Sequence, residues 1–309
     1  MKKTFNYKDI PYLLKETYKE WDNDDPFGRS AAIAYYTIFS LPGLLIIIVT
    51  VAGMVYGEEA VQGALSDQIA DMVGGKAAKE VENIIAKSKV EANFTLATFI
   101  GIGTLLFGAT GLFVQLQKAL NHIWGVKVKD SAGYMKLVMD RVTSLGIIIM
   151  IGFLLMVSLV LSTAISAFSD LISTYFSESL VIVSHLLNIA LSLAIITLLF
   201  ATIFKVLPDV DVTWKMVWKG ALITAILFTL GKFGIGVYLG TSKPDSAFGA
   251  AGSIILILLW VSYSCLILFF GAEFTQVYSR TYGRGIQPSS HAERTPAFKL
   301  KNGEVDIEY

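Results

Sequence analysis

The chain lacks an excess of either charge and has almost no cysteine. Its 25 lysines and arginines balance 25 aspartates and glutamates, so the net charge gives no general attraction to nucleic acid. The single cysteine, Cys265, lies in an apolar stretch and has no second cysteine for an intramolecular disulfide, which favours a packing role. Charged residues make up only 16% of the 309 positions and hydrophobic residues 54%, with a mean hydropathy of +0.61. This composition predicts a membrane protein.

The common motifs of catalysis are missing as well. The sequence has no P-loop for ATP and no GxSxG nucleophile elbow. Its three histidines, His122, His185 and His291, are spread over a membrane edge, a span and the tail, which does not suggest a metal triad. We therefore expect no enzymatic activity and no cofactor. The N-terminus has no apolar core followed by a cleavage site, so we expect no removable signal peptide and assign insertion to the first apolar span.

Charge is absent altogether from Ser246 to Ala272. As a helix, these 27 residues would reach ~40 Å, more than the ~30 Å hydrocarbon core of a bilayer. Five other spans have little or no charge, so we predict an all-α, polytopic membrane protein with a bundle of six transmembrane helices. The six predicted spans are Ser30 to Gly57, Ala92 to Gln117, Ser144 to Ser169, Ser179 to Phe204, Gly220 to Gly240 and Ser246 to Ala272.

The distribution of lysine and arginine predicts the orientation. Nineteen of these residues lie in the N-terminal segment, the second and fourth loops and the tail, and five lie in the loops on the other side. Positive charge is enriched on the cytoplasmic side, so both termini are expected in the cytoplasm of a bacterial inner-membrane protein. Membrane lipids are the expected partners, nucleic acid is not, and a homo-oligomer is possible.

Segments outside the spans have patterns of their own. Residues 1–29 are expected to form a cytoplasmic amphipathic segment whose helix lies on the membrane, with Asp9 as N-cap, Pro11 in the first turn and Trp21 at headgroup level. Residues 30–282 form the membrane domain, and residues 283–309 a mobile cytoplasmic tail. Residues 58–91 are expected to form an extracytoplasmic helical hairpin whose two apolar faces carry Val61, Leu65, Ile69 and Met72, and Ala77, Val81, Ile84, Ile85 and Ser88.

Polar groups at membrane depth are candidates for function. Lys232 in the fifth span either reaches the outer headgroups or attracts an anionic group in a cavity, and Glu273 near the end of the sixth span either pairs with a cation or carries a proton or cation. His185 and Asn188 share a face of the fourth span and are candidates for interhelical hydrogen bonds. In the first span, a polar stripe precedes a kink at Pro42; it comprises Tyr35, Tyr36, Thr37 and Ser40.

Three carboxylates, Asp22, Asp24 and Asp25, crowd together before the first span. They could hold a divalent cation, but a turn that ends one helix and caps the next is the favoured interpretation. Glycines at GxxxG spacing and in the second span predict close packing of helices.

Two stretches resemble the YihY/BrkB family of bacterial inner-membrane proteins. They are SAAIAYYTIFSLPG, from Ser30 to Gly43, and GAAGSIILILLWVSYSCLILFFGAEFT, from Gly249 to Thr275, and the spacing of spans is similar over Lys15 to Tyr282. Ser262 departs from the Tyr pair of many members. The resemblance implies six helices and cytoplasmic termini. Members were formerly labelled ribonuclease BN and have been connected with serum resistance and envelope lipid export. The matching motif positions are Tyr35, Tyr36, Ser40, Pro42, Gly249, Gly252, Trp260, Tyr263, Gly271 and Glu273.

The favoured hypothesis is a transporter, or flippase-like exporter, of a lipid or other amphipathic envelope component. Its cavity would be lined by the first, fifth and sixth spans, with Tyr35, Tyr36, Ser40, Pro42, Lys232, Trp260, Tyr263 and Glu273 as candidate residues. The alternatives are a membrane-anchored nuclease, for which only the Asp22, Asp24 and Asp25 cluster offers carboxylates, and a scaffold that does not transport.

Overall fold

The computed structural model describes residues 6–73, 75–87, 96–129, 133, 135–136, 138–154, 157, 178–242, 252–296 and 298. Helices dominate the described part, and each predicted span overlaps one of them. A short 3-10 helix, η1 (Tyr7–Asp9), precedes α1 (Ile10–Asn23), α2 (Pro26–Tyr56), α3 (Glu58–Val73), α4 (Gly75–Lys87), α5 (Leu96–Ile123), a helix over 138–154, α7 (Glu178–Val206), α8 (Trp214–Ser242) and α10 (Gly252–Tyr282).

Four of these helices are long and apolar enough to cross a membrane. They are parts of α2, α7, α8 and α10, over Pro26–Met54, Leu186–Val206, Trp214–Ile235 and Gly252–Tyr282. The predicted all-α membrane class is therefore confirmed. The count of six spans stays a prediction, because the second half of the third predicted span lies outside the described residues.

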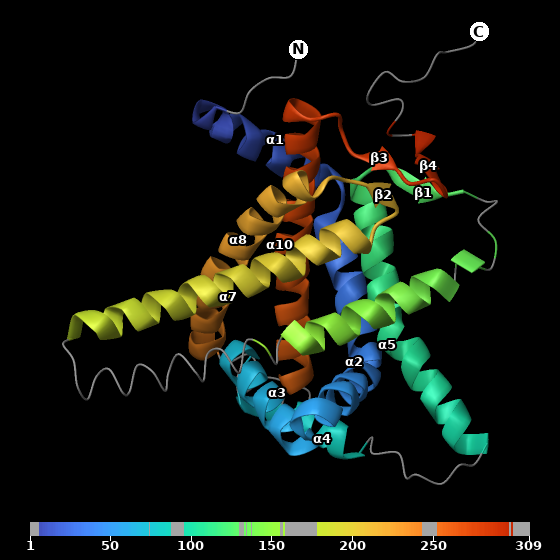
Figure 1. The fold of residues 1–309 in the computed structure, drawn as a ribbon, viewed down its shortest axis with the longest axis vertical. Helices are drawn as coiled ribbons and strands as arrows, with labels where there is room; N and C mark the ends of the chain where they lie inside the picture. The colour runs from blue at the N-terminus through green and yellow to red at the C-terminus, as the bar shows by residue number, and fades with distance from the viewer. Residues whose placement is uncertain are drawn as a thin grey trace.

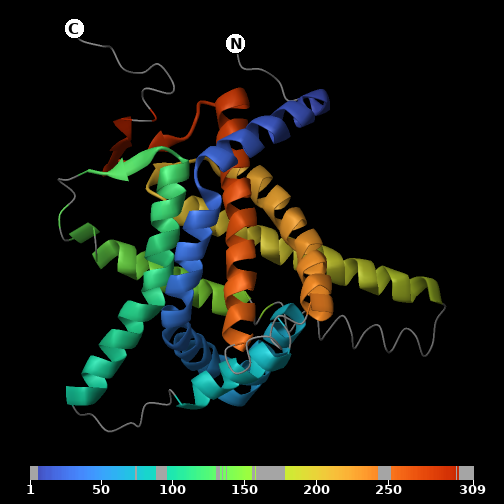
Figure 2. The ribbon, with the colours of Figure 1, turned by 180° about the vertical axis from the view of Figure 1, so that it is seen from behind.

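The helices form a bundle with two different ends (Figure 1). α2 packs along α5 and α10, and α8 packs against α7 and α10. The helix over 138–154 and α7 run obliquely across one face of this group, and the opposite view in Figure 2 places them behind it. One end carries α1 and four short strands, and we call it the strand end; α3 and α4 lie at the other, which we call the hairpin end.

The acidic turn between α1 and α2 has the favoured structure. α1 ends at Asn23, and Asp25 is the N-cap of α2, where its side chain accepts a hydrogen bond from the Gly28 N–H at 3.1 Å. Asp9 is the N-cap residue of α1, as predicted, but its carboxylate accepts a 2.6 Å hydrogen bond from the Tyr282 hydroxyl. α2 continues through Pro42 without a break in the assigned helix.

Small residues let α8 and α10 approach closely. A Cβ added to Gly271 of α10 would lie 1.7 Å from the Thr224 hydroxyl of α8, and one added to Gly220 of α8 would lie 1.8 Å from the Thr275 hydroxyl of α10. Each helix thus offers a glycine to a threonine of the other. Among the glycines of the second predicted span, a Cβ added to Gly111 would make an ordinary 3.5 Å contact with the Ser40 hydroxyl of α2, and one added to Gly103 would meet no atom within 4 Å.

The apolar faces predicted for residues 58–91 are turned inward. Val61 and Leu65 of α3 and Val81 and Ile85 of α4 are buried in the main hydrophobic core, together with side chains of α2 and α5. The side chains of Met72 and Ser88 lie outside the described part. Amphipathic helices bury such faces against apolar partners, and here the partner is the end of the bundle.

The residues after α10 differ from the predicted mobile tail. Strand β3 (Gln287–Pro288) pairs antiparallel with β2 (Val210–Asp211), and β4 (Ala292–Arg294) pairs antiparallel with β1 (Val126–Val128). Backbone hydrogen bonds to the segments after α5 and α7 thus fix residues 287–294. Strands of two or three residues are too short to give a periodic pattern in the sequence, which is why the prediction missed them.

Candidate functional site

The polar residues predicted to form one inner stripe of α2 divide between two environments. Ser40 is 2% exposed, and Thr37 is buried, with its hydroxyl bonded to the Ile33 carbonyl. Tyr35 and Tyr36 are 59% and 40% exposed, and their rings meet edge to face with centroids 5.7 Å apart. At 100° per residue, Tyr35 lies about 140° around the helix from Ser40 and Tyr36 about 40°, so Tyr35 does not share the face of Ser40. Their role as cavity residues stays a prediction.

Three other predicted residues lie where α8 meets α10. The Tyr263 hydroxyl fills the space beside Gly231, where an added Cβ would come within 1.0 Å of it. Lys232 follows Gly231, is half-buried, and forms no ion pair with another described residue. Trp260 is buried, with its ring centroid 5.9 Å from that of Phe228 in α8. Trp260 and Tyr263 thus face the helix bundle.

Glu273 lies in the most enclosed part of α10. Every residue from Gly271 to Ser279 is buried, and Glu273 itself is 1% exposed. Two tryptophans hold this part of the helix: Trp124 Nε1 donates to the Ala272 carbonyl at 3.0 Å, and Trp21 Nε1 donates to the Leu266 carbonyl at 3.1 Å. Burial of a carboxylate at this depth is compatible with either predicted use, the ion pair or the transport role.

The structure indicates less about the remaining candidate residues. Asn188 is half-buried on α7, and the side chain of His185 lies outside the described part. The described residues contain no group of three or more His, Cys, Asp or Glu side chains placed to hold a metal ion, and the Asp22, Asp24 and Asp25 segment forms the turn described above.

A buried polar cluster at the strand end was not predicted. Its centre is Asp209, which follows α7 and is 4% exposed. Asp209 Oδ1 lies 2.7 Å from Lys136 Nζ and 2.8 Å from His291 Nε2. Asp209 Oδ2 accepts hydrogen bonds from the side-chain amides of Asn121 at 2.7 Å and Gln117 at 3.1 Å. We call these five residues, with Asp140, the Asp209 cluster.

The backbone of Asp209 takes part too. Its N–H donates to Asn121 Oδ1 at 2.8 Å, and its carbonyl accepts from the Ser289 N–H at 3.1 Å. Asp140 accepts a hydrogen bond from the Lys136 ammonium and another, at 3.1 Å, from Gln117 Nε2. The cluster therefore joins four segments: the end of α5, the start of the helix over 138–154, the turn after α7 and the tail.

The electrostatics of the cluster favour its charged form. Burial alone would raise the pKa of Asp209, but hydrogen bonds from Lys136, Asn121 and His291 outweigh it and hold that pKa below its usual range. Burial alone would lower the pKa of Lys136, but hydrogen bonds to Asp140 and Asp209 raise it. Both groups are therefore ionised across the physiological pH range. Asn121 lies four residues after Gln117, so the sequence does place these two amides on one face of α5, but it does not indicate their partner.

The helical bundle and its apolar spans define the class: this is an integral membrane protein. The family described as Virulence factor BrkB matches residues 17–296, and the chain belongs to it. It is similar to relatives named UPF0761 membrane protein: one in Saccharophagus degradans, 26% identical over 273 residues (88% of this chain and 60% of the relative), and one in Aeromonas salmonicida, 30% identical over 186 residues (60% and 61%).

A third relative, UPF0761 membrane protein PSHAa0171 of Pseudoalteromonas translucida, is 27% identical over 283 residues, covering 91% of this chain and 88% of the relative. Matches span only about 60% of the length of the first two relatives. No solved structure matches the chain.

Proposed function

We propose that this protein is a transporter that moves a lipid, or another amphipathic envelope component, through the junction of α2, α8 and α10. The observation that carries the proposal is that apolar side chains from all three helices fill this junction. Ile38 of α2, Phe228 of α8 and Trp260 of α10 meet there in one apolar cluster, and the hairpin end adds Ile69 of α3 and Ala77 of α4. An amphipathic substrate needs an apolar surface whose contacts it can replace with its own chains, and this junction offers one.

Polar groups border the junction on the α8 side. The Tyr263 hydroxyl sits against Gly231, and the next residue, Lys232, is a half-buried cation within an otherwise apolar helix. Ionisable groups at this depth commonly mark the path of a polar or charged substrate. A cation and a hydroxyl beside an apolar surface suit an anionic head joined to apolar chains.

The helix pair α3–α4 is the natural cover of this path. α3 contacts α8, α4 contacts α10, and Ser66 of α3 donates a hydrogen bond to Glu82 of α4, which links the two helices. We assign the structure to a closed state that opens when this pair moves off α8 and α10. The proposal includes six membrane crossings with both chain ends in the cytoplasm of a bacterium, and it assigns no enzymatic reaction to the chain.

Cross-linking tests the proposal. Ala77 and Ile257 share the apolar cluster between α4 and α10. We expect Ala77→Cys with Ile257→Cys, joined by a short bismaleimide, to block movement of a fluorescent phospholipid in proteoliposomes. The native thiol is removed by Cys265→Ala in every variant, so that only the introduced thiols can react. The matched control joins Val128→Cys to Ala292→Cys, which face each other across β1 and β4. Blocked transport in the control, or normal transport in the first variant, contradicts the proposal.

Single substitutions test the residue assignments in the same assay. Lys232→Ala removes the cation of the path and Glu273→Gln removes a buried carboxylate, and both are expected to lower the transport rate. If both variants move lipid at the wild-type rate, these two residues do not serve the substrate.

A further inference from the structure

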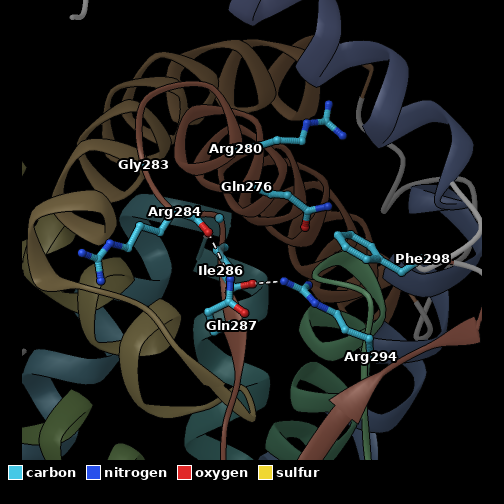
Figure 3. Close-up of a pocket in the computed structure, with 9 residues that line it drawn as sticks. Gln276, Arg280, Gly283, Arg284, Ile286, Gln287, Arg294 and Phe298 are labelled. Atoms are coloured by element: carbon cyan, nitrogen blue, oxygen red, sulfur yellow. Dashed lines mark hydrogen bonds between the residues drawn. The ribbon is translucent and has the colours of Figure 1, made fainter. Parts of the chain in front are cut away.

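A pocket at the strand end holds three arginines. It lies beyond the last turns of α10 and has a volume of about 320 Å³. Arg280, Arg284 and Arg294 line it with the amides of Gln276 and Gln287, and none of its described lining residues is acidic (Figure 3). The transport path proposed above does not use this pocket. Its chemistry is that of an anion site.

Arg294 forms a fixed cationic wall of the pocket. Its guanidinium donates to the carbonyl of Ile286 and, at 3.2 Å, to that of Trp124. It also lies 4.4 Å from the centroid of the Phe298 ring. These contacts hold the planar group in one orientation, so binding an anion there requires little ordering of the side chain.

Arg280 and Arg284 stand on the rim. Arg280 lies 3.4 Å from a Glu16 oxygen and 3.3 Å from a Glu20 oxygen of α1, which is long for charge-assisted hydrogen bonds. Arg284 is exposed and forms no ion pair with another described residue, and its guanidinium points away from Gln276 and Arg294 in Figure 3. The long side chain of Arg284 can turn toward a ligand in the pocket, whereas Arg280 stays beside α1 and adds positive charge at the rim.

Gln276 indicates a second chemical group that a ligand of this pocket should carry. It is 9% exposed, and its side-chain oxygen has no hydrogen-bond partner within the described part of the chain. In Figure 3 the amide of Gln276 and the guanidinium of Arg294 point toward the same hollow. A buried acceptor without a donor is unfavourable. A ligand that carries a hydroxyl beside an anionic group would satisfy both residues.

The depth of the pocket points to the membrane face. Gln276 lies four residues and Arg280 eight residues beyond Ala272, the end of the uncharged span. At ~1.5 Å per residue these are ~6 Å and ~12 Å beyond the last uncharged residue, in the direction of the lipid headgroups. Cations at a helix C-terminus also offset its dipole, but that effect requires no pocket and gives Gln276 no donor.

We propose that this pocket binds a phosphate ester that carries a hydroxyl group, on a lipid headgroup or on a small soluble molecule. The phosphate lies against Arg294, Arg284 closes over it, Arg280 adds positive charge at the rim, and the hydroxyl donates to the Gln276 amide oxygen. Basic pockets beside membrane helices are known to bind anionic headgroups in this way. The proposal is independent of transport, because a protein that fails to move lipid can still bind this ligand.

The test compares two sources of the same chemistry. For the lipid source, the full chain is placed in nanodiscs of phosphatidylcholine with a minor fraction of phosphatidylglycerol, and lipids that remain bound are counted by native mass spectrometry. For the soluble source, glycerol 3-phosphate is added to the detergent-purified protein and the unfolding temperature is measured. Enrichment of phosphatidylglycerol identifies the lipid source, and a rise in unfolding temperature identifies the soluble one. Either positive result supports the proposal. If phosphatidylglycerol is not enriched and the unfolding temperature does not rise, the proposal is overturned.

Three variants locate the site. Arg284→Gln removes one rim cation and is expected to lower affinity about fivefold. Gln276→Glu keeps the side-chain shape but places a negative charge in the pocket, so binding should be lost. Lys215→Gln removes an exposed cation from the same end of the bundle and is the matched control, with wild-type binding expected. Equal losses in Arg284→Gln and Lys215→Gln would indicate attraction to general surface charge and overturn the site. Arg284→Gln decides the question if Gln276→Glu does not fold.

Discussion

The strand end and the hairpin end of the bundle are held together by different chemistry. At the strand end, buried Asp209 bonds side chains from three other segments, and Arg280 of α10 contacts Glu20 of α1. At the hairpin end, α3 and α4 meet the bundle through apolar side chains such as Ile69 and Ala77. Helix α10 therefore has directional polar contacts near the strand end and non-directional contacts at the hairpin end.

This difference indicates which end can move. Displacing a segment at the strand end would leave buried donors and charges without partners, which is strongly unfavourable. Separating the apolar faces of α3–α4 from the bundle loses only packing, and lipid chains or an amphipathic substrate can replace it. The strand end thus serves as the fixed part of the molecule and the hairpin end as the mobile cover in our proposal.

Removing the charge of Asp209 should have the largest effect on the strand end. Asp209→Asn keeps the size of the side chain but removes one of the two carboxylates bonded to the Lys136 ammonium, so that only Asp140 remains. Breaking a buried ion pair completely costs roughly 3–5 kcal/mol. Because Asp140 still pairs with Lys136, we expect the free energy of unfolding, measured by titration with SDS, to fall by about 3 kcal/mol, the lower end of that range.

Asp211→Asn is the matched control, because Asp211 is exposed only two residues further along the chain. A surface change of this kind should stay within about 0.5 kcal/mol. If both variants unfold alike, the Asp209 cluster does not fix the strand end.

Titration should remove the same stabilisation gradually. The pKa of Asp209 is lowered, so its contribution is complete above the usual carboxyl pKa of about 4 and is lost as pH falls through the lower native value. The pKa of Lys136 is raised, so its contribution is complete below about 10.4 and is lost as pH rises through the higher native value. The stability difference between wild type and Asp209→Asn should therefore be constant between about pH 8 and pH 9, where neither group changes its charge, and shrink at both extremes. A difference that changes steadily between these two pH values would contradict this.

The sequence could predict the hairpin end better than the strand end. The 3.6-residue period exposes the apolar faces of α3 and α4, and Val61, Leu65, Val81 and Ile85 are buried as that period requires. The acidic turn before α2 was predictable because N-capping is a local interaction, seen at Asp25.

The Asp209 cluster has no such local signal. Asp209 binds Asn121 and Gln117 across separations of 88 and 92 residues, and His291 across 82. No periodicity relates positions so far apart. The predicted cavity residues show the same limit: the position of Trp260 and Tyr263 in the middle of an uncharged span favours side chains that face the bundle, but it could not show that the Tyr263 hydroxyl fills the space beside Gly231.

Filling the space beside Gly271, where α10 packs against Thr224 of α8, should have the next largest effect on stability. Gly271→Ala places a methyl group 1.7 Å from the Thr224 hydroxyl, so the two helices must separate or Thr224 must turn. Overpacking of this kind costs about 1–3 kcal/mol. We expect a matching fall in unfolding temperature, partly restored in the double variant with Thr224→Ala.

Gly234→Ala, in the same helix as Thr224, is the control, because an added Cβ there meets no other atom within 4 Å. It should be neutral or slightly stabilising. Rescue by Thr224→Ala matters most, since a loss that the second change does not repair would arise from something other than this contact.

The smallest effect is expected from cutting the link between the tail and the Asp209 cluster. The His291 side chain is 43% exposed, and its 2.8 Å contact with Asp209 is one of four made by that carboxylate. His291→Ala should lower the free energy of unfolding by only about 1 kcal/mol, whereas His291→Gln, whose Nε2 can donate to Asp209, should restore most of it. Transport should be unchanged in both, because β3 and β4 still join the tail to the strand end. A loss in His291→Ala as large as that in Asp209→Asn would mean that the tail, and not the contacts between helices, holds this end of the bundle together.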